Sequence, residues 1–236
     1  MTRDELLQLG AQPGDLLMVH ASMRAVGGRA EEVVRAVLDA IGRDGTLMAY
    51  VDFEPTDEVP VFDLTASPAA RDYGVLAEIV RRWPGGVRSG NPGASMVAIG
   101  ANAAWLCANH PLKYGYGPGS PLSKLVEREG KILLLGSHFD HVTLLHYAEH
   151  LAGIPNKRVV RCSVQTSAGT TLDIEEFDTS EGVVPAMPED YFDEVVRAFV
   201  AAGHARTGRV GGATSQLLSA RQLVSFAVEK MERDFG

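Results

Sequence analysis

The sequence predicts an α/β fold: a central mixed or parallel sheet with helices on both faces, plus a C-terminal hairpin-and-helix region. Short apolar segments typical of buried strands alternate along the chain with amphipathic segments of helical period. Residues 132–135 are all aliphatic, as expected for a strand that is covered on both sides. No repeat, low-complexity tract or clear linker interrupts the pattern, so we expect a single domain over residues 1–236.

The N-terminal half begins with a capping box, Thr2 with Glu5, which predicts a helix over 3–9 that ends at Gly10. The elements expected next are a strand at 16–20, a helix at 31–41 and a strand at 46–50. The acidic, proline-broken segment that follows, through Pro68, has no periodicity. It is long enough to suggest a binding role rather than a simple connection.

The second half predicts a similar alternation that ends in a hairpin and helices. We expect Asp140 to cap a helix from about 141 to 150, after the strand at 132–135. The remaining expected elements are helices at 73–83, 101–108 and 121–129, a strand at 96–99, a hairpin of 158–165 with 170–177 that turns at Ala168-Gly169, a helix at 189–202, a short turn or strand at 208–212, and a helix from about 220 to 233.

Charge and hydropathy narrow the function classes. The formal net charge of −8 argues against nucleic acid as the main partner, although carboxylates in a cleft would attract a polycation. No apolar run approaches the ~18–20 residues of a membrane helix, and the charged N-terminus lacks a signal-peptide core, so we expect a cytoplasmic protein without a membrane partner. Cys107 and Cys162 lack metal-like spacing and are expected as reduced thiols.

The segment 146–150, His-Tyr-Ala-Glu-His, is the strongest candidate for chemistry. His146 and Glu149 are three residues apart and share one helical face, so Glu149 could orient the imidazole as a general base. Thr143 and the start of the helix could stabilise an oxyanion. The same letters match the reversed zincin pattern with His146, Glu149 and His150 as a zinc site. A third reading is a helix with incidental surface histidines.

Two further sets of residues could bind ligands. The segment 20–28, with His20, Ser22 and Arg24, follows a strand, and its free backbone N–H groups could receive phosphates; an ordinary β–α turn fits it equally well. Several acids lie in loops or at strand ends. Gathered around one cleft they would form a cation-binding wall, although singly each fits a surface carboxylate: Asp52, Glu54, Glu175, Glu176 and Asp178.

In their order and spacing, several segments together resemble the aminoglycoside 3-N-acetyltransferases, the antibiotic N-acetyltransferase family. The first is 17–24, Leu-Met-Val-His-Ala-Ser-Met-Arg, similar to the family's V-H-S-S-L-R. The most specific is L-L-L-G-x-x-x-D-x-x-T-x-x-H-x-x-E over 133–149. Further matches are 45–48, 88–95, 119–122, 176–178 and the pair Tyr191-Phe192. The chain departs from the family pattern at Ala21, Asn91 and Val142, and in the loop after Tyr50.

The resemblance implies direct transfer of acetyl from acetyl-CoA to the 3-amino group of a 2-deoxystreptamine aminoglycoside, and hence antibiotic resistance. It needs no metal and no covalent acyl-enzyme. It implies that His146 is the general base, Glu149 its orienter, and Thr143 a ligand of the thioester oxygen. The residues implied to hold CoA are His20, Ser22, Arg24, Ala25, Val26 and Ser95. Those implied to bind substrate ammonium groups are Asp52, Glu176 and Asp178.

Three alternatives stay open at this point, together with the choice between a monomer and a homodimer. The unusual loop around Asp52 motivates an acyltransferase for a non-antibiotic amine metabolite. A zinc hydrolase would use His146, Glu149 and His150. The third alternative is a non-catalytic binding protein, which the intact His146–Glu149 pair disfavours.

Overall fold

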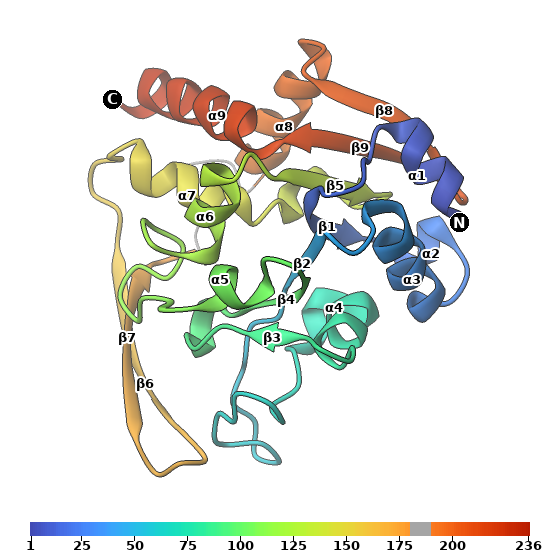
Figure 1. Cartoon of the computed structure of the whole chain (residues 1–236). Coiled ribbons are helices and arrows are strands. Elements are labelled where there is room, and N and C mark those ends of the chain that lie inside the picture. The colour runs from blue at the N-terminus through green and yellow to red at the C-terminus, as the bar shows by residue number, and fades with distance from the viewer. Residues whose placement is uncertain (180–189) are drawn as a thin grey trace.

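The computed structural model describes residues 1–179 and 190–236. A seven-stranded sheet forms its centre (Figure 1). Across the sheet the strands are ordered β3 (Val87–Arg88), β4 (Met96–Gly100), β2 (Thr46–Tyr50), β1 (Leu16–Ala21), β5 (Lys131–Leu135), β9 (Ala213–Ser219) and β8 (Ala205–Val210). β1 runs parallel to both β2 and β5, and the other pairings are antiparallel, so the sheet is mixed as expected.

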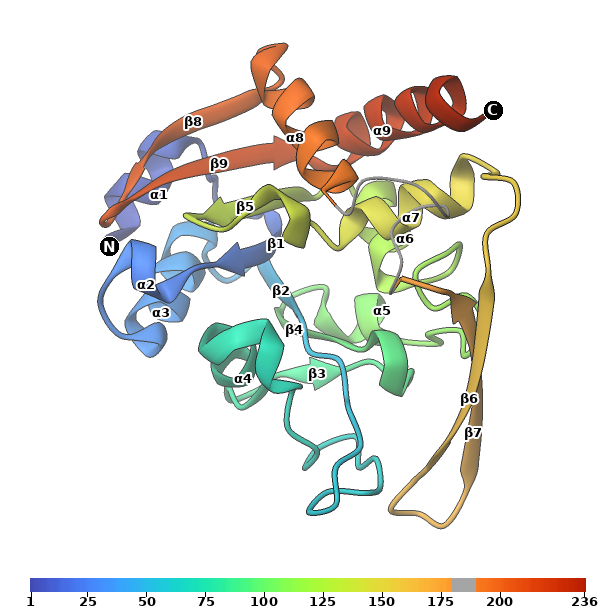
Figure 2. The same ribbon diagram turned by 180° about the vertical axis from the view of Figure 1, so that it is seen from behind.

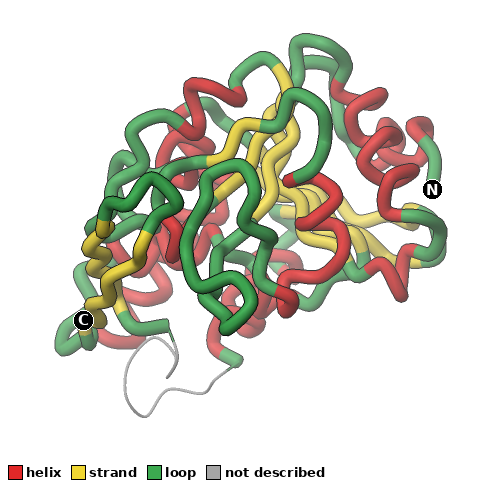
Figure 3. The backbone as a smooth tube through the Cα atoms, turned by 90° about the horizontal axis from the view of Figure 1, so that it is seen from below, coloured by secondary structure: helices red, strands yellow, loops and turns green. Residues whose placement is uncertain are grey.

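Both faces of the sheet are covered. Successive side chains of a strand point to opposite faces, so an all-apolar strand contributes to the core on each side. In β5, Ile132 and Leu134 join one core cluster while Leu133 and Leu135 join the other. The prediction that this strand is buried on both sides is confirmed. Figures 2 and 3 show the helices on either side of the sheet.

The helices divide between the two core clusters. One face packs on α1 (Arg3–Leu9), α2 (Met23–Val26), α3 (Ala30–Ile41) and α4 (Gly74–Arg81). The other packs on α5 (Ala103–Cys107), α6 (Pro121–Glu127), α7 (Leu144–Leu151), α8 (Tyr191–Ala201) and α9 (Ala220–Phe235). The Thr2–Glu5 capping box is present at α1, and the Ser120 side chain caps α6. No helix within 1–179 or 190–236 is both long and apolar enough to cross a bilayer.

The predicted hairpin is confirmed as β6 (Val159–Gln165) with β7 (Thr171–Phe177), a separate two-stranded sheet. The long loop after β2 packs against it, as Figure 1 shows below the main sheet. Phe62 in this loop bridges to Thr166 at the hairpin tip, and its ring packs in a small cluster with Val164 and Ile174. The hairpin therefore supports the loop that leads to α4.

One local prediction is wrong. Asp140 does not cap a long helix: residues 139–141 form a single 3₁₀ turn, and α7 begins only at Leu144, after Thr143 at the N-cap. Val142 between them is fully buried with φ −75° and ψ 85°, which is outside the helical region and separates the two turns. In α8, the expected starting residue Glu189 lies outside the described residues.

The predicted turn or strand at 208–212 is confirmed: it forms the end of β8 and the turn into β9, and this hairpin adds two strands beside β5. Gly211 at its turn has φ +58°, a conformation that favours glycine. The sequence of β9 does not alternate between apolar and polar residues. Its strand conformation comes from pairing with β5, which no local pattern indicates.

Candidate active site

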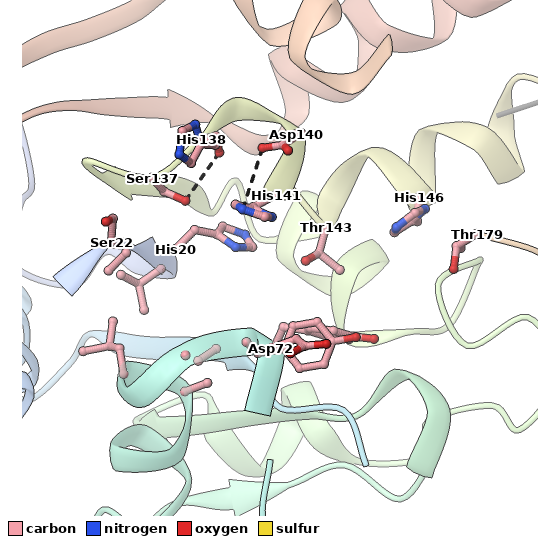
Figure 4. A pocket seen from close by; sticks show the side chains of 18 of the residues that line it. His20, Ser22, Asp72, Ser137, His138, Asp140, His141, Thr143, His146 and Thr179 are labelled. Atoms are coloured by element: carbon pink, nitrogen blue, oxygen red, sulfur yellow. Dashed lines mark hydrogen bonds and ion pairs between the residues drawn. The ribbon is translucent and has the colours of Figure 1, made fainter. Parts of the chain in front are cut away.

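A cavity of about 390 Å³ opens at the carboxyl ends of the three parallel strands. Tyr50 ends β2, His20 lies near the end of β1, and Ser137 follows β5, and all three line the cavity. The carboxyl edge of parallel strands is the usual place for a ligand in α/β proteins. In the view of Figure 4, Thr143 lies between His20 and His146, with Asp72 across the cavity.

His146 and Glu149 form the pair that the sequence predicts. Nδ1 of His146 and Oε2 of Glu149 are 2.6 Å apart. Burial raises the pKa of Glu149, but the hydrogen bond and charge of His146, together with the charge of Lys157, outweigh it and hold the pKa below its usual value. Glu149 is therefore a carboxylate, and it accepts a hydrogen bond from Nδ1–H. In the neutral form of His146, Nε2 is then the nitrogen that carries the lone pair.

Two aromatic rings hold the His146 imidazole in place. The Tyr116 ring lies 4.9 Å from it, centroid to centroid, and the Phe192 ring of α8 packs edge-on at 5.0 Å. The His146 side chain is 22% exposed, so it is ordered and also accessible from the cavity that it lines. Thr143, one turn earlier, faces the same cavity.

Lys157 completes this group of charges, and the sequence analysis missed it. Its Nζ lies 2.7 Å from Oε1 of Glu149, so each carboxylate oxygen has its own donor. The Lys157 side chain is 4% exposed. No short-range pattern links a lysine eight positions after a glutamate, because the turn between them decides whether they meet.

His150 points to a different partner from His146. Its Nε2 lies 2.9 Å from Oε1 of Glu176, and its ring stacks on Phe177 at 4.2 Å. The donors needed for the reversed zincin pattern therefore do not converge. Within 1–179 and 190–236, no group of three or more His, Cys, Asp or Glu side chains could hold a metal ion.

Two of the residues expected to hold the acyl donor line the cavity: His20 and Ser22. Nε2 of His20 is buried without a hydrogen-bond partner among the described residues. Burial, and to a lesser degree the charge of His141, lowers the pKa of His20 to about 4, so the ring is neutral at pH 7. A buried polar atom of this kind beside a cavity is suited to a ligand group.

The other four residues expected to hold CoA do not line the cavity. The N–H groups of Ala25 and Val26 donate to the carbonyl oxygen of Ser22 and are not free for phosphates. Val26 packs in the core, whereas Arg24 is exposed in α2. Ser95 is fully buried, donates to the Val51 carbonyl, and does not line the cavity.

The three acids expected to bind ammonium groups do not line the cavity either. Glu176 accepts hydrogen bonds from the backbone N–H groups of Tyr116 and Phe177 besides its pair with His150. Asp178 pairs with Arg158. Asp52 is half-buried and accepts a hydrogen bond from the Phe53 N–H. Each of these carboxylates therefore has partners within the protein, which spacing in the sequence does not reveal.

Two other acids and three tyrosines line the cavity instead. Asp72 and Asp140 line the cavity, as do Tyr50, Tyr73 and Tyr116. The hydroxyl groups of Tyr50 and Tyr116 are 2.5 Å apart, and the Tyr73 ring packs edge-on against Tyr50 at 4.6 Å. Tyr50 could have been found from the sequence, since it ends a predicted strand. Tyr73 ends a 3₁₀ turn (Arg71–Tyr73) directly before α4, and Tyr116 lies in a loop.

Comparisons with known proteins show the family of the chain. The family model described as aminoglycoside 3-N-acetyltransferase matches residues 18–232. The chain belongs to this family. An aminoglycoside N(3)-acetyltransferase III of Pseudomonas aeruginosa is 40% identical, with 99% of this chain and 93% of the relative covered.

Solved structures of the family share the fold. AAC-IIIb in a binary complex with CoASH is 45% identical with a TM-score of 0.95, covering 100% of this chain and 98% of that one. AAC-VIa bound to sisomicin is 34% identical with a TM-score of 0.91, covering 100% and 99%. The α/β fold predicted from the sequence is thereby confirmed, as is the resemblance to the family.

Proposed function

We propose that this family member transfers an acetyl group from acetyl-CoA to the 3-amino group of 2-deoxystreptamine aminoglycosides and so confers antibiotic resistance. The CoASH complex of AAC-IIIb and the sisomicin complex of AAC-VIa support the two substrates. The observation that carries the mechanism is the 2.6 Å contact of His146 with the ionised Glu149 at the wall of the cavity.

In this mechanism the acyl donor lies along the His20 end of the cavity. The Ser22 hydroxyl makes no side-chain cap to α2 and can meet the donor, and exposed Arg24 supplies positive charge for its phosphates. The Thr143 hydroxyl can donate to the thioester oxygen as negative charge develops on it. The amine substrate enters past Asp72 and Asp140, whose carboxylates attract its ammonium groups.

The reaction is a direct displacement. Nε2 of His146 takes a proton from the amino group, and the amine nitrogen attacks the thioester carbon. The C–S bond then breaks, and the CoA thiolate receives the proton that His146 took from the amine, giving the amide, free CoASH and neutral His146. Glu149 fixes the tautomer of His146 throughout, because its carboxylate binds Nδ1–H. No covalent intermediate on the protein is needed.

A thiol-release assay with acetyl-CoA and a panel of aminoglycosides tests the proposal. We expect free thiol with at least one 2-deoxystreptamine compound, and acetylation at its 3-amino group by mass spectrometry and NMR. Release of thiol with none of them, while other amines are acetylated, would assign a different amine substrate to the chain.

The variant His146→Ala tests the base. We expect the rate to fall by about 10²–10⁴-fold, the usual contribution of a general base, with CoA binding nearly unchanged. His204→Ala is the matched control, because His204 is exposed and lies outside this cavity. Full activity of His146→Ala would place the base elsewhere, with His20 the next candidate.

A further inference from the structure

We propose that Lys157 is a positioning residue of the catalytic pair, which balances the charge of Glu149 and so keeps His146 a neutral proton acceptor near pH 7. The proposal rests on the proposed function for its kinetic consequence. The effect of Lys157 on His146, which passes through the buried carboxylate between them, can be measured without any substrate.

The chain turns sharply to bring Lys157 back to α7. Gly153 and Asn156 both adopt left-handed conformations, with φ +58° and +60°. Ile154 between them is buried and anchors the turn. As a result, Lys157 meets the same carboxylate that His146 contacts one helical turn earlier.

The contact is buried on both sides. The Lys157 side chain is 4% exposed and that of Glu149 is 2% exposed, with 2.7 Å between Nζ and Oε1. Ion pairs at such sites are screened little by solvent, so the lysine charge acts strongly on the carboxylate. A surface lysine would have no comparable effect.

Charge balance gives Lys157 its role. A buried carboxylate next to an imidazole stabilises the imidazolium form, which cannot accept a proton. Lys157 already compensates the negative charge of Glu149. The carboxylate therefore stabilises the imidazolium form of His146 less than it would without Lys157. Glu149 can then hold Nδ1–H by its hydrogen bond while Nε2 keeps its lone pair.

Other groups also face His146, and all of them are present in each variant below. Tyr116 packs on the ring, and Phe192 of α8 carries no charge. The remaining titratable groups of the cavity wall in the described part of the chain are His20, Tyr50, Asp72, Tyr73, His138, Asp140 and His141. Next to the pair, His150 is bound to Glu176 and Arg158 to Asp178.

The decisive experiment is an NMR titration of ring-labelled histidines in the ligand-free protein, with His146 assigned from the His146→Ala spectrum. In Lys157→Met we expect the titration midpoint of His146 to rise by about one pH unit, a modest shift for loss of a charge one group away. Lys157→Arg should restore the wild-type midpoint. Lys230→Met is the control, because Lys230 pairs with Asp234 in α9, away from the cavity.

Kinetics provide the second readout. The acid limb of kcat/KM should move upward in Lys157→Met by the same amount, so that activity lost at pH 7 returns at pH 8–9. A purely structural role would lower activity equally at all pH values and leave the midpoint unchanged, which would overturn the proposal.

Lys157→Gln, which keeps an N–H donor but loses the charge, guards against misfolding of the methionine variant. It should show the same raised midpoint, whereas failure of both variants to fold would reduce Lys157 to a stability role and overturn the proposal. If the wild type acetylates no aminoglycoside, the proposed function fails, and the NMR titration still decides the role of Lys157.

Discussion

Glu149 is a buried carboxylic acid and Asp52 a half-buried one, and their surroundings push their acidities in opposite directions. Glu149 has a cationic donor on one oxygen and an imidazole N–H on the other. For Asp52, burial raises the pKa to about 7, only partly offset by hydrogen bonds from the Phe53 N–H and the Tyr50 hydroxyl. The charge of Arg88 also acts to lower the pKa of Asp52 without cancelling the effect of burial, whereas Glu149 has a lysine in direct contact.

The pH dependence of stability follows from Asp52. Its pKa in the folded protein lies above the ~3.9 of an unfolded chain, so between about pH 4 and 7 only the folded state holds the proton. The free energy of unfolding contributed by this group therefore falls as pH rises through that window. In urea titrations at pH 5 and pH 7.5, Asp52→Asn should lose less stability than the wild type between the two pH values.

Asp57→Asn is the control, because Asp57 lies exposed in the same loop and should leave the wild-type pH dependence intact. Identical slopes for Asp52→Asn and the wild type would contradict the prediction.

At the scale of elements, Arg88 of β3 joins the sheet edge to the loop between β2 and α4. Its guanidinium donates to the carbonyl oxygens of Val51 and Ser67, both at 2.6 Å, and to the Ser95 hydroxyl at 3.1 Å. It also lies over the Phe62 ring. The loop fastened in this way leads directly to Tyr73 on the cavity wall.

Arg88→Met should lower the free energy of unfolding by roughly 2–5 kcal/mol, because the Ser67 carbonyl loses its guanidinium donor and the Val51 carbonyl keeps only the Ser95 hydroxyl. We also expect a raised KM for the amine, since the wall that carries Tyr73 loosens. Thermal and urea unfolding together with steady-state kinetics measure the two effects. Arg71→Met, an exposed change in the same loop, should stay within about 0.5 kcal/mol of the wild type; equal stability of both variants would refute the role of Arg88.

For the whole molecule, a net charge of −8 should favour the encounter with a polycationic antibiotic and oppose that with anionic acetyl-CoA. Raising the salt from 20 to 300 mM should therefore raise KM for the aminoglycoside, while KM for acetyl-CoA stays level or falls. Steady-state kinetics with each substrate varied in turn check this. A KM for the aminoglycoside that does not respond to salt would contradict it.

Sequence reasoning succeeded wherever the deciding contacts are local. The continuous aliphatic run of β5, the capping box of α1 and the hairpin turn at Ala168-Gly169 follow from a few neighbouring residues. The His146–Glu149 pair belongs here too, since three residues on a helix place two side chains together. The expectation of one domain over residues 1–236 stays a prediction.

The differences between expectation and structure have a common physical origin. β9 is a strand because β5 offers it a partner, and Val142 interrupts the expected helix because the core takes its side chain. Ser95 and Glu176 have residue types suited to ligand binding, but packing turns both inward.

By itself, therefore, the sequence determined the alternating strands and helices, the family, and the carboxylate one turn from the imidazole. Only the tertiary structure decided that Lys157 returns to Glu149, that three tyrosines and Asp72 line the cavity, and that Asp52, Glu176 and Asp178 do not. The reason is that helical and strand periods set which near neighbours share a face. Burial and charge pairing between distant segments depend instead on how the whole chain packs.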